Sequence, residues 1–178
     1  FYMYPDNKES RSHSRFSLAL EHTRNGRYTI AEKIYQELLL TDPDSIWFNY
    51  ALAENMEYRN HLETATQLYR SMLLVYPADI AITARLVNVL LVQNQPETAL
   101  NIVMQLYEEH KAQSRVYKLL SDIYRKLNND PSRQLAEANY HWFSGNKKQA
   151  RIQFKALISK GILDAADAES IKEKLALD

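Results

Sequence analysis

Apolar and small residues recur along the chain at intervals of 34 residues. Ala31, Ala65 and Ala99 mark this period, and the first two units match at five positions. A unit of this length holds one pair of helices, and stacked pairs bury a continuous core that a single unit cannot form. The pattern therefore predicts an all-α fold of stacked antiparallel helix pairs. The matched pairs are Leu18 with Leu52, Ala19 with Ala53, Ala31 with Ala65, Tyr35 with Tyr69, and Pro43 with Pro77.

The residue types within each unit fit two closely packed helices. The repeated alanines are expected where the two helices of a pair approach each other closely. The repeated tyrosines are expected to fill the gap between one helix pair and the next. A proline opens each following unit, where its missing N–H costs nothing in the first helical turn. A Leu-Ala pair, then Ala-x3-Tyr, then Pro resembles the tetratricopeptide repeat (TPR) pattern. The resemblance implies a right-handed superhelical solenoid of about ten helices.

The predicted units become less regular toward the C-terminus. They occupy residues 12–45, 46–79, 80–113, 114–144 and 145–160, and a capping helix follows over 164–176. In the third unit Lys111 replaces the closing proline, and the fourth has no alanine where its second helix should carry one. The helix from about 131 to 144 is therefore expected to pack on the helix before it and also to lead into the next, which carries Ala150-x3-Phe154. Asp164 is expected to be the N-cap of the last helix.

Stacked repeats share one core, so the sequence predicts a single domain over residues 11–178. Residues 1–10 are expected to be a linker from a preceding region, because the chain opens with Phe1 instead of Met.

Composition narrows the classes of partner. The 22 basic and 22 acidic residues give zero net charge, and the longest basic run is Lys147-Lys148. Nucleic acid is therefore not expected as a partner, because backbone binding needs a concentrated positive surface. No stretch approaches 18 apolar residues, so no membrane insertion is expected. Cysteine is absent, which excludes disulfides and thiolate chemistry.

The sequence offers little to a catalytic or metal site. None of the five histidines belongs to an H-E-x-x-H motif or to a pair four residues apart. There is also no G-x-S-x-G motif, no glycine-rich phosphate loop and no cysteine nucleophile. We therefore expect a chain that is not an enzyme and that holds no cofactor or metal, and whose function is to bind protein or peptide.

The TPR resemblance also indicates where a partner would bind, because in that family the first helix of each pair lines a concave groove. The aromatic cluster of the second pair and the basic stretch of the fourth would suit an extended peptide or a protruding loop with an apolar and an acidic part. The alternative is that Trp47 and Tyr50 pack the core between repeats. The expected groove residues are His13, Phe16, Leu20 and Arg24; Trp47, Tyr50, Glu54, Glu57 and Tyr58; Asn88, Leu91 and Val92; and Arg115, Lys118, Asp122 and Arg125.

A narrower resemblance covers the C-terminal third. The segment from Arg115 to Leu175 resembles the C-terminal TPR region of bacterial envelope zinc metalloproteases of the BepA type, and the helix with two roles is its distinctive part. The residues that carry it include Tyr117, Leu119-Leu120, Tyr124-x2-Leu127, Ala136-Glu137-x2-Tyr140, Gly145 and Ala150-x2-Gln153.

This resemblance implies a periplasmic protein whose TPR region contacts outer-membrane assembly components and positions misassembled envelope substrates. Zinc would then be held only by an H-E-x-x-H peptidase domain upstream of Phe1. The alternative is a TPR adaptor or scaffold of a multiprotein complex unrelated to proteolysis, in the cytoplasm or the envelope.

Overall fold

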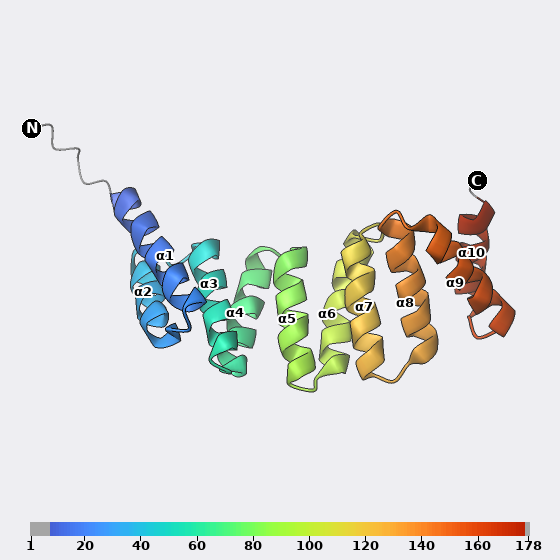
Figure 1. Cartoon of the computed structure of the whole chain (residues 1–178), viewed down its shortest axis with the longest axis horizontal. Helices are drawn as coiled ribbons and strands as arrows, with labels where there is room; N and C mark the ends of the chain where they lie inside the picture. The colour runs from blue at the N-terminus through green and yellow to red at the C-terminus, as the bar shows by residue number, and fades with distance from the viewer. Residues whose placement is uncertain (1–7, 177–178) are drawn as a thin grey trace, which may run out of the picture. The chain divides into compact units, whose positions relative to one another are not determined.

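The computed structural model describes the backbone of residues 8–176 and the side chains of residues 11–176. Within the described backbone there are ten α-helices and no strand, which confirms the all-α fold (Figure 1). The handedness of a superhelix stays a prediction. The helices are α1 (Lys8–Arg24), α2 (Tyr28–Thr41), α3 (Ile46–Tyr58), α4 (Leu62–Val75), α5 (Ile80–Val92), α6 (Pro96–Glu109), α7 (Ser114–Lys126), α8 (Asp130–Phe143), α9 (Lys147–Lys160) and α10 (Ala165–Ala176).

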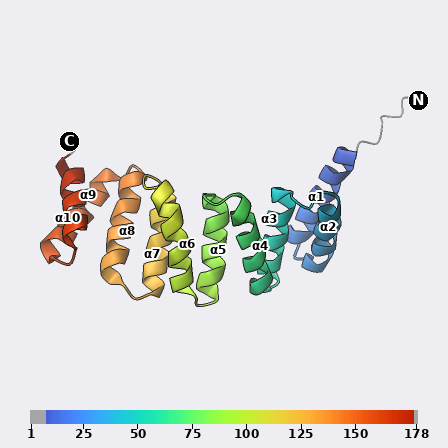
Figure 2. The ribbon, with the colours of Figure 1, turned by 180° about the vertical axis from the view of Figure 1, so that it is seen from behind.

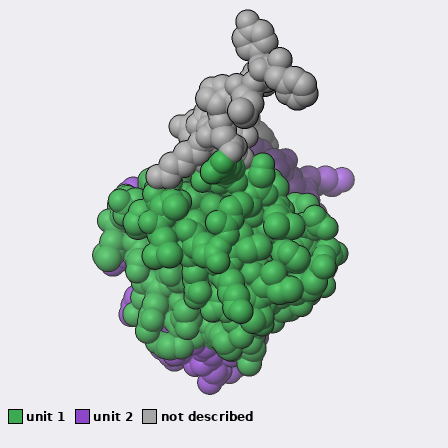
Figure 3. Space-filling view, turned by 90° about the vertical axis from the view of Figure 1, so that its left-hand side faces the viewer, with its two compact units in different colours: residues 1–77 green, residues 78–178 purple. Residues whose placement is uncertain are grey.

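The chain divides into two compact units, which Figure 3 colours separately. Unit 1 covers residues 1–77 and contains α1 to α4, and unit 2 covers residues 78–178 and contains α5 to α10. A single domain over residues 11–178 therefore stays a prediction. Helix α1 begins at Lys8, so it includes the last three residues of the expected linker, and residues 1–7 lie outside the described part.

The repeated small and aromatic residues form the core of unit 1. Helix α1 packs on α2, α2 on α3, and α3 on α4. Leu18 departs from its repeat partner, because it is 46% exposed whereas Leu52 is buried. Leu52 lies on α3, which packs on α2 of the preceding pair. No described helix precedes α1, so Leu18 has no preceding pair to cover it. The fully buried repeat residues are Ala19, Ala31, Tyr35, Ala53, Ala65 and Tyr69.

The turns within helix pairs explain the unusual end of unit 2. Each such turn contains a residue with positive φ, a conformation that Gly and Asn adopt most easily. These residues are 34 apart until Asn128, and Gly145 then follows after only 17. Helix α8 lies between these last two turns and packs on both α7 and α9, as both views show (Figure 1, Figure 2). The two roles predicted for this helix are therefore confirmed. The positive-φ residues in these turns are Gly26, Asn60, Asn94, Asn128 and Gly145, and a further one, Gly161, lies at the end of α9.

Helix α10 closes the core of unit 2. The Asp164 carboxylate accepts a hydrogen bond from the Asp167 backbone N–H at 2.8 Å, which confirms the predicted N-cap. Ile171 is buried in the cluster around Phe154, and Leu175 packs against the same cluster. The exposed residues of α10 include Glu169, Lys172 and Glu173.

The buried alanines give a direct test of the repeat register. Ala65→Leu should lower the free energy of unfolding by about 1–3 kcal/mol, because added methylenes overpack a close helix contact. Thermal unfolding followed by circular dichroism measures the effect. Ala81→Leu, at an exposed position on α5, is the matched control and should change stability by less than about 0.5 kcal/mol. An unchanged melting temperature for Ala65→Leu would contradict the assigned register.

Candidate functional site

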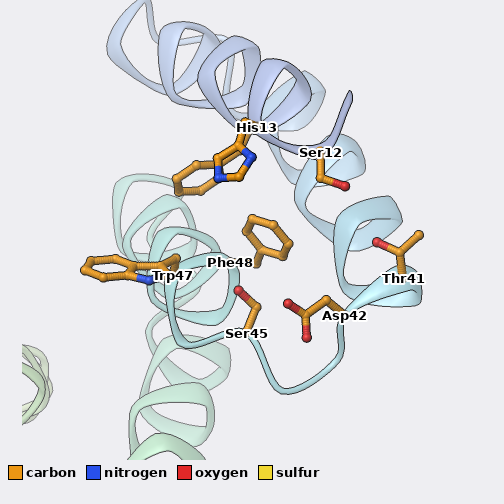
Figure 4. Close-up of a pocket in the computed structure, with 8 residues that line it drawn as sticks. Ser12, His13, Thr41, Asp42, Ser45, Trp47 and Phe48 are labelled. Carbon is orange, nitrogen blue, oxygen red and sulfur yellow. The ribbon is translucent and has the colours of Figure 1, made fainter. Parts of the chain in front are cut away.

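A pocket of about 590 Å³ opens in unit 1 where α1, the end of α2 and the start of α3 meet (Figure 4). In the close-up, Trp47 and His13 lie on one side of Phe48, and Asp42 and Thr41 lie on the other. The pocket is therefore built from two helix pairs of the same unit. Its lining residues are Ser12, His13, Phe16, Thr41, Asp42, Ser45, Trp47 and Phe48.

The turn between α2 and α3 fixes one wall of this pocket. The Asn49 side-chain amide donates to the Pro43 carbonyl at 2.9 Å and to the Ser45 carbonyl at 3.0 Å. Ser45 has an extended backbone, so α3 begins at Ile46 and carries Trp47 and Phe48 in its first turn. The hydrogen bonds therefore tie the connection between α2 and α3 to the first turns of α3, where the aromatic pair lies.

Aromatic rings pack against one another in the floor of the pocket. The ring centroids of Phe16 and Phe48 are 5.2 Å apart, and Phe16 meets Tyr35 edge-on at 6.1 Å. Tyr35 is fully buried, and burial raises the pKa of its hydroxyl. Trp47 belongs to the same pocket but is 73% exposed. The pocket thus combines a packed aromatic floor with one tryptophan that the described residues leave largely uncovered.

The lining chemistry suits an apolar side chain with polar groups next to it. The phenyl and indole surfaces supply apolar contact, while the Asp42 carboxylate and the hydroxyls of Ser12, Thr41 and Ser45 can bond backbone groups of a peptide. Among the described residues, no group of three His, Cys, Asp or Glu side chains could hold a metal ion.

The aromatic residues of α3 that were expected in the groove differ in their burial and contacts. Tyr50 is half-buried and meets the buried Tyr69 edge-on, with ring centroids 5.9 Å apart. The packing alternative therefore describes Tyr50, whereas Trp47 is exposed. Tyr58 stacks on Tyr28 at 5.5 Å and is 56% exposed, outside the residues that line the pocket. The remaining expected residues of unit 1 are the half-buried Leu20, Glu54 and Glu57 and the exposed Arg24.

The expected basic stretch of unit 2 is largely paired with carboxylates. Asp122 accepts from Lys118 at 3.1 Å and from Arg125 at 2.8 Å. Arg125 also lies 3.6 Å from Glu137, which accepts from Arg133 at 2.8 Å. These pairs reduce the positive potential that Lys118 and Arg125 can offer to an acidic ligand.

Other expected residues of unit 2 lie apart from this network. Arg115 on α7 is exposed, as are Asn88 and Val92 on α5, and Leu91 is half-buried. A smaller pocket of about 190 Å³ opens beside the ion pairs. It is lined by Lys118, Ser121, Arg125, Glu137, Tyr140 and His141.

Several pocket residues were missed by reasoning from the sequence. The TPR resemblance predicts the groove on the first helix of each pair, whereas Thr41, Asp42 and Ser45 lie in or beside the connection between pairs. Phe48 directly follows Trp47, so the aromatic pair after Pro43 was the available signal. The direction in which Phe48 packs depends on its contact with Phe16. Phe16 lies 32 residues earlier in the chain, so the local hydrophobic pattern does not predict this contact.

The fold defines the class of protein. Helix pairs of about 34 residues, with alanines at the contacts and a polar final helix, are the architecture of tetratricopeptide repeat proteins. Among the described helices, none combines the length and the apolar character needed to cross a membrane.

Solved structures with the same architecture are known, although no protein-family model and no curated sequence matches the chain. A thermophilic TPR protein of Thermus thermophilus is 14% identical, with a TM-score of 0.56, over 93% of this chain and 100% of that one. MamA of Desulfovibrio magneticus RS-1 is 15% identical, with a TM-score of 0.64, over 94% and 97%. PilF of Pseudomonas aeruginosa is 17% identical, with a TM-score of 0.57, over 89% and 80%. These similarities show that the chain has the TPR fold.

Proposed function

We propose that this chain is a non-catalytic protein-binding domain that holds an extended peptide or protruding loop through the pocket of unit 1. The observation that carries the proposal is the exposed Trp47 beside the packed rings of Phe16 and Phe48. The TPR fold supports it, because helical repeats present extended binding surfaces.

The pocket has the features of an interaction hot spot. Tryptophan is enriched among residues that dominate binding energy, especially where a preformed pocket surrounds it. The contacts of Phe16 with Phe48 and Tyr35 keep the floor in place before a partner arrives, which lowers the entropic cost of binding. Asp42 and the neighbouring hydroxyls provide a polar rim. We therefore infer a ligand with an apolar or aromatic side chain flanked by backbone donors.

Trp47→Ala should weaken peptide binding by about tenfold or more, because an anchor tryptophan typically contributes more than about 1–2 kcal/mol. The melting temperature should stay unchanged, since the side chain is 73% exposed. Peptides selected from a phage-displayed library on the wild-type chain supply the ligands, and calorimetric titration measures their affinity. Circular dichroism reports the stability.

Tyr76→Ala is the matched control, because Tyr76 is a partly exposed aromatic residue of unit 1 outside the pocket. This variant should bind the selected peptides as the wild type does. Selected peptides that bind equally well to Trp47→Ala would contradict the proposed site. A Trp142→Phe background leaves Trp47 as the single tryptophan, so a blue shift of its emission on binding gives an independent readout.

A narrower proposal concerns the parent protein. We propose that the chain is the recognition region of a periplasmic zinc metalloprotease, with envelope substrates or outer-membrane assembly components as partners. The support is the sequence resemblance of residues 115–175, together with the two roles of α8 that are its distinctive part. The alternative is an adaptor or scaffold unrelated to proteolysis.

The coding sequence upstream of Phe1 distinguishes the metalloprotease from the adaptor as the parent protein. The protease proposal expects a signal sequence and a helix with H-E-x-x-H there, and zinc bound only by that domain. An upstream region without this motif favours the adaptor.

A further inference from the structure

Positive charge is concentrated in helices α7 to α9, although the net charge of the whole chain is zero. Residues 114–160 contain more than three times as many basic as acidic side chains. The basic residues are Arg115, Lys118, Arg125, Lys126, Arg133, Lys147, Lys148, Arg151, Lys155 and Lys160, and the acidic ones are Asp122, Asp130 and Glu137.

The acidic residues of this segment lie on α7 and α8, where they form ion pairs with basic residues of the same two helices. Asp122 pairs with Lys118 and Arg125, and Glu137 and Asp130 pair with Arg133. Helix α9, from Lys147 to Lys160, contains five basic residues and no acidic one. The excess positive charge of the segment is therefore greatest on α9.

The faces of α9 are sharply divided. Ala150, Phe154 and Leu157 are buried in the core of unit 2. Lys148, Ile152 and Lys155 are spaced by four and three residues, so they share the opposite face, and all three are exposed. Ile152 is 58% exposed in the middle of this row. We call these three residues the α9 face.

Neighbouring basic side chains are held in place around this face. The Lys147 ammonium lies 4.8 Å from the centroid of the Trp142 ring, and the Arg151 guanidinium carbon lies 5.9 Å from it. The Lys160 ammonium donates to the Gln134 side-chain carbonyl at 2.9 Å. The basic side chains that flank the α9 face are therefore partly ordered by contacts within unit 2.

We propose that the α9 face docks an acidic amphipathic segment of a partner protein, in which an apolar residue lies between carboxylates. The carboxylates would pair with Lys148 and Lys155 while the apolar residue covers Ile152. This surface lies in unit 2 and is distinct from the pocket of unit 1, so it goes beyond the proposed function.

The composition of the face favours a protein over the other anionic partners. A nucleic-acid phosphate backbone offers no apolar group that could pack on Ile152 at the centre of the face. No aromatic residue is exposed on α9 for base stacking. A helix that lies on a membrane needs a wide apolar face directed at the lipid. The apolar face of α9 is instead buried in the core, which leaves Ile152 as the single apolar residue of the α9 face.

The test uses two fluorescein-labelled synthetic helical peptides of identical composition. In the first, glutamates lie three and four residues on either side of a central leucine; in the second, the leucine is moved to one end. Fluorescence anisotropy with the whole chain should show tighter binding of the first peptide, and binding that weakens as salt is added.

Charge reversal of the face should remove most of this binding. Lys148→Glu/Lys155→Glu should weaken the affinity by about tenfold or more, because two attractions become repulsions. Ile152→Ser should weaken it by about threefold through loss of apolar contact. Lys33→Glu/Lys172→Glu makes the same change in net charge at exposed positions elsewhere and should bind normally. Trp47→Ala should also bind normally, which separates this result from a failure of the unit 1 pocket.

Several outcomes would overturn the proposal. They are equal losses in the two charge-reversal variants, equal binding of the two peptides, or no peptide binding at low salt. Tighter binding to duplex DNA or to phosphatidylglycerol vesicles, lost in Lys148→Glu/Lys155→Glu, would assign the α9 face to nucleic acid or membrane instead. Circular dichroism of each variant verifies that the helices are intact.

Discussion

Phe154→Ala should lower the free energy of unfolding of unit 2 by about 3–5 kcal/mol, the usual cost of truncating a buried phenylalanine. Phe154 is 0% exposed and lies at the centre of the cluster that joins α8, α9 and α10. Its ring centroid is 6.0 Å from that of Trp142. Urea unfolding followed by Trp142 fluorescence, in a Trp47→Phe background, measures the change where it occurs.

Ile152→Ala is the control on the same helix. Ile152 is 58% exposed, so its truncation should cost much less than that of Phe154. If the two variants unfolded at the same urea concentration, the assignment of the two faces of α9 would be wrong. The α9 face of the docking proposal would then be wrong as well.

Asn55→Ala should destabilise unit 1 by about 2–3 kcal/mol, because it leaves buried polar groups without their partner. Asn55 is fully buried, and its side-chain amide donates to the Tyr28 carbonyl at 3.0 Å. Its side-chain oxygen accepts from the Thr23 hydroxyl at 3.3 Å. The residue therefore ties α3 to both helices of the preceding pair. Chemical denaturation followed by circular dichroism measures the loss.

Asn88→Ala is the matched control for this variant, because Asn88 is an exposed asparagine on a helix. Its replacement should leave stability within about 0.5 kcal/mol of the wild type. An equally small effect at Asn55 would mean that water replaces the amide at the junction between the two helix pairs.

The two proposed surfaces have opposite chemistry. The unit 1 pocket offers aromatic rings and a carboxylate, whereas the α9 face offers lysines around one isoleucine. The sequence predicts one groove for an apolar and an acidic part of a ligand, whereas the two proposals concern an apolar anchor in the unit 1 pocket and an acidic amphipathic segment on the α9 face of unit 2. The experiments on Trp47 and on Lys148/Lys155 test them independently.

The sequence by itself determined the helix pairs and most of their core. The 34-residue period identifies which alanines and tyrosines lie at helix contacts, because a side chain's direction on a helix follows from its position in the turn. It also indicated the N-cap at Asp164 and the two roles of α8, since the missing alanine and the early Gly145 are local features.

Only the tertiary structure decided which groove residues are available to a ligand. Tyr50 and Trp47 are both aromatic and lie on the same helix, yet Tyr50 packs on Tyr69 while Trp47 stays exposed. Likewise, pairing with Asp122 and Glu137 reduces the charge of the α7 basic residues, while those of α9 have no acidic residue on their own helix. Burial and charge pairing depend on neighbours from other helices, and helical periodicity along one segment carries no information about which side chain those neighbours present.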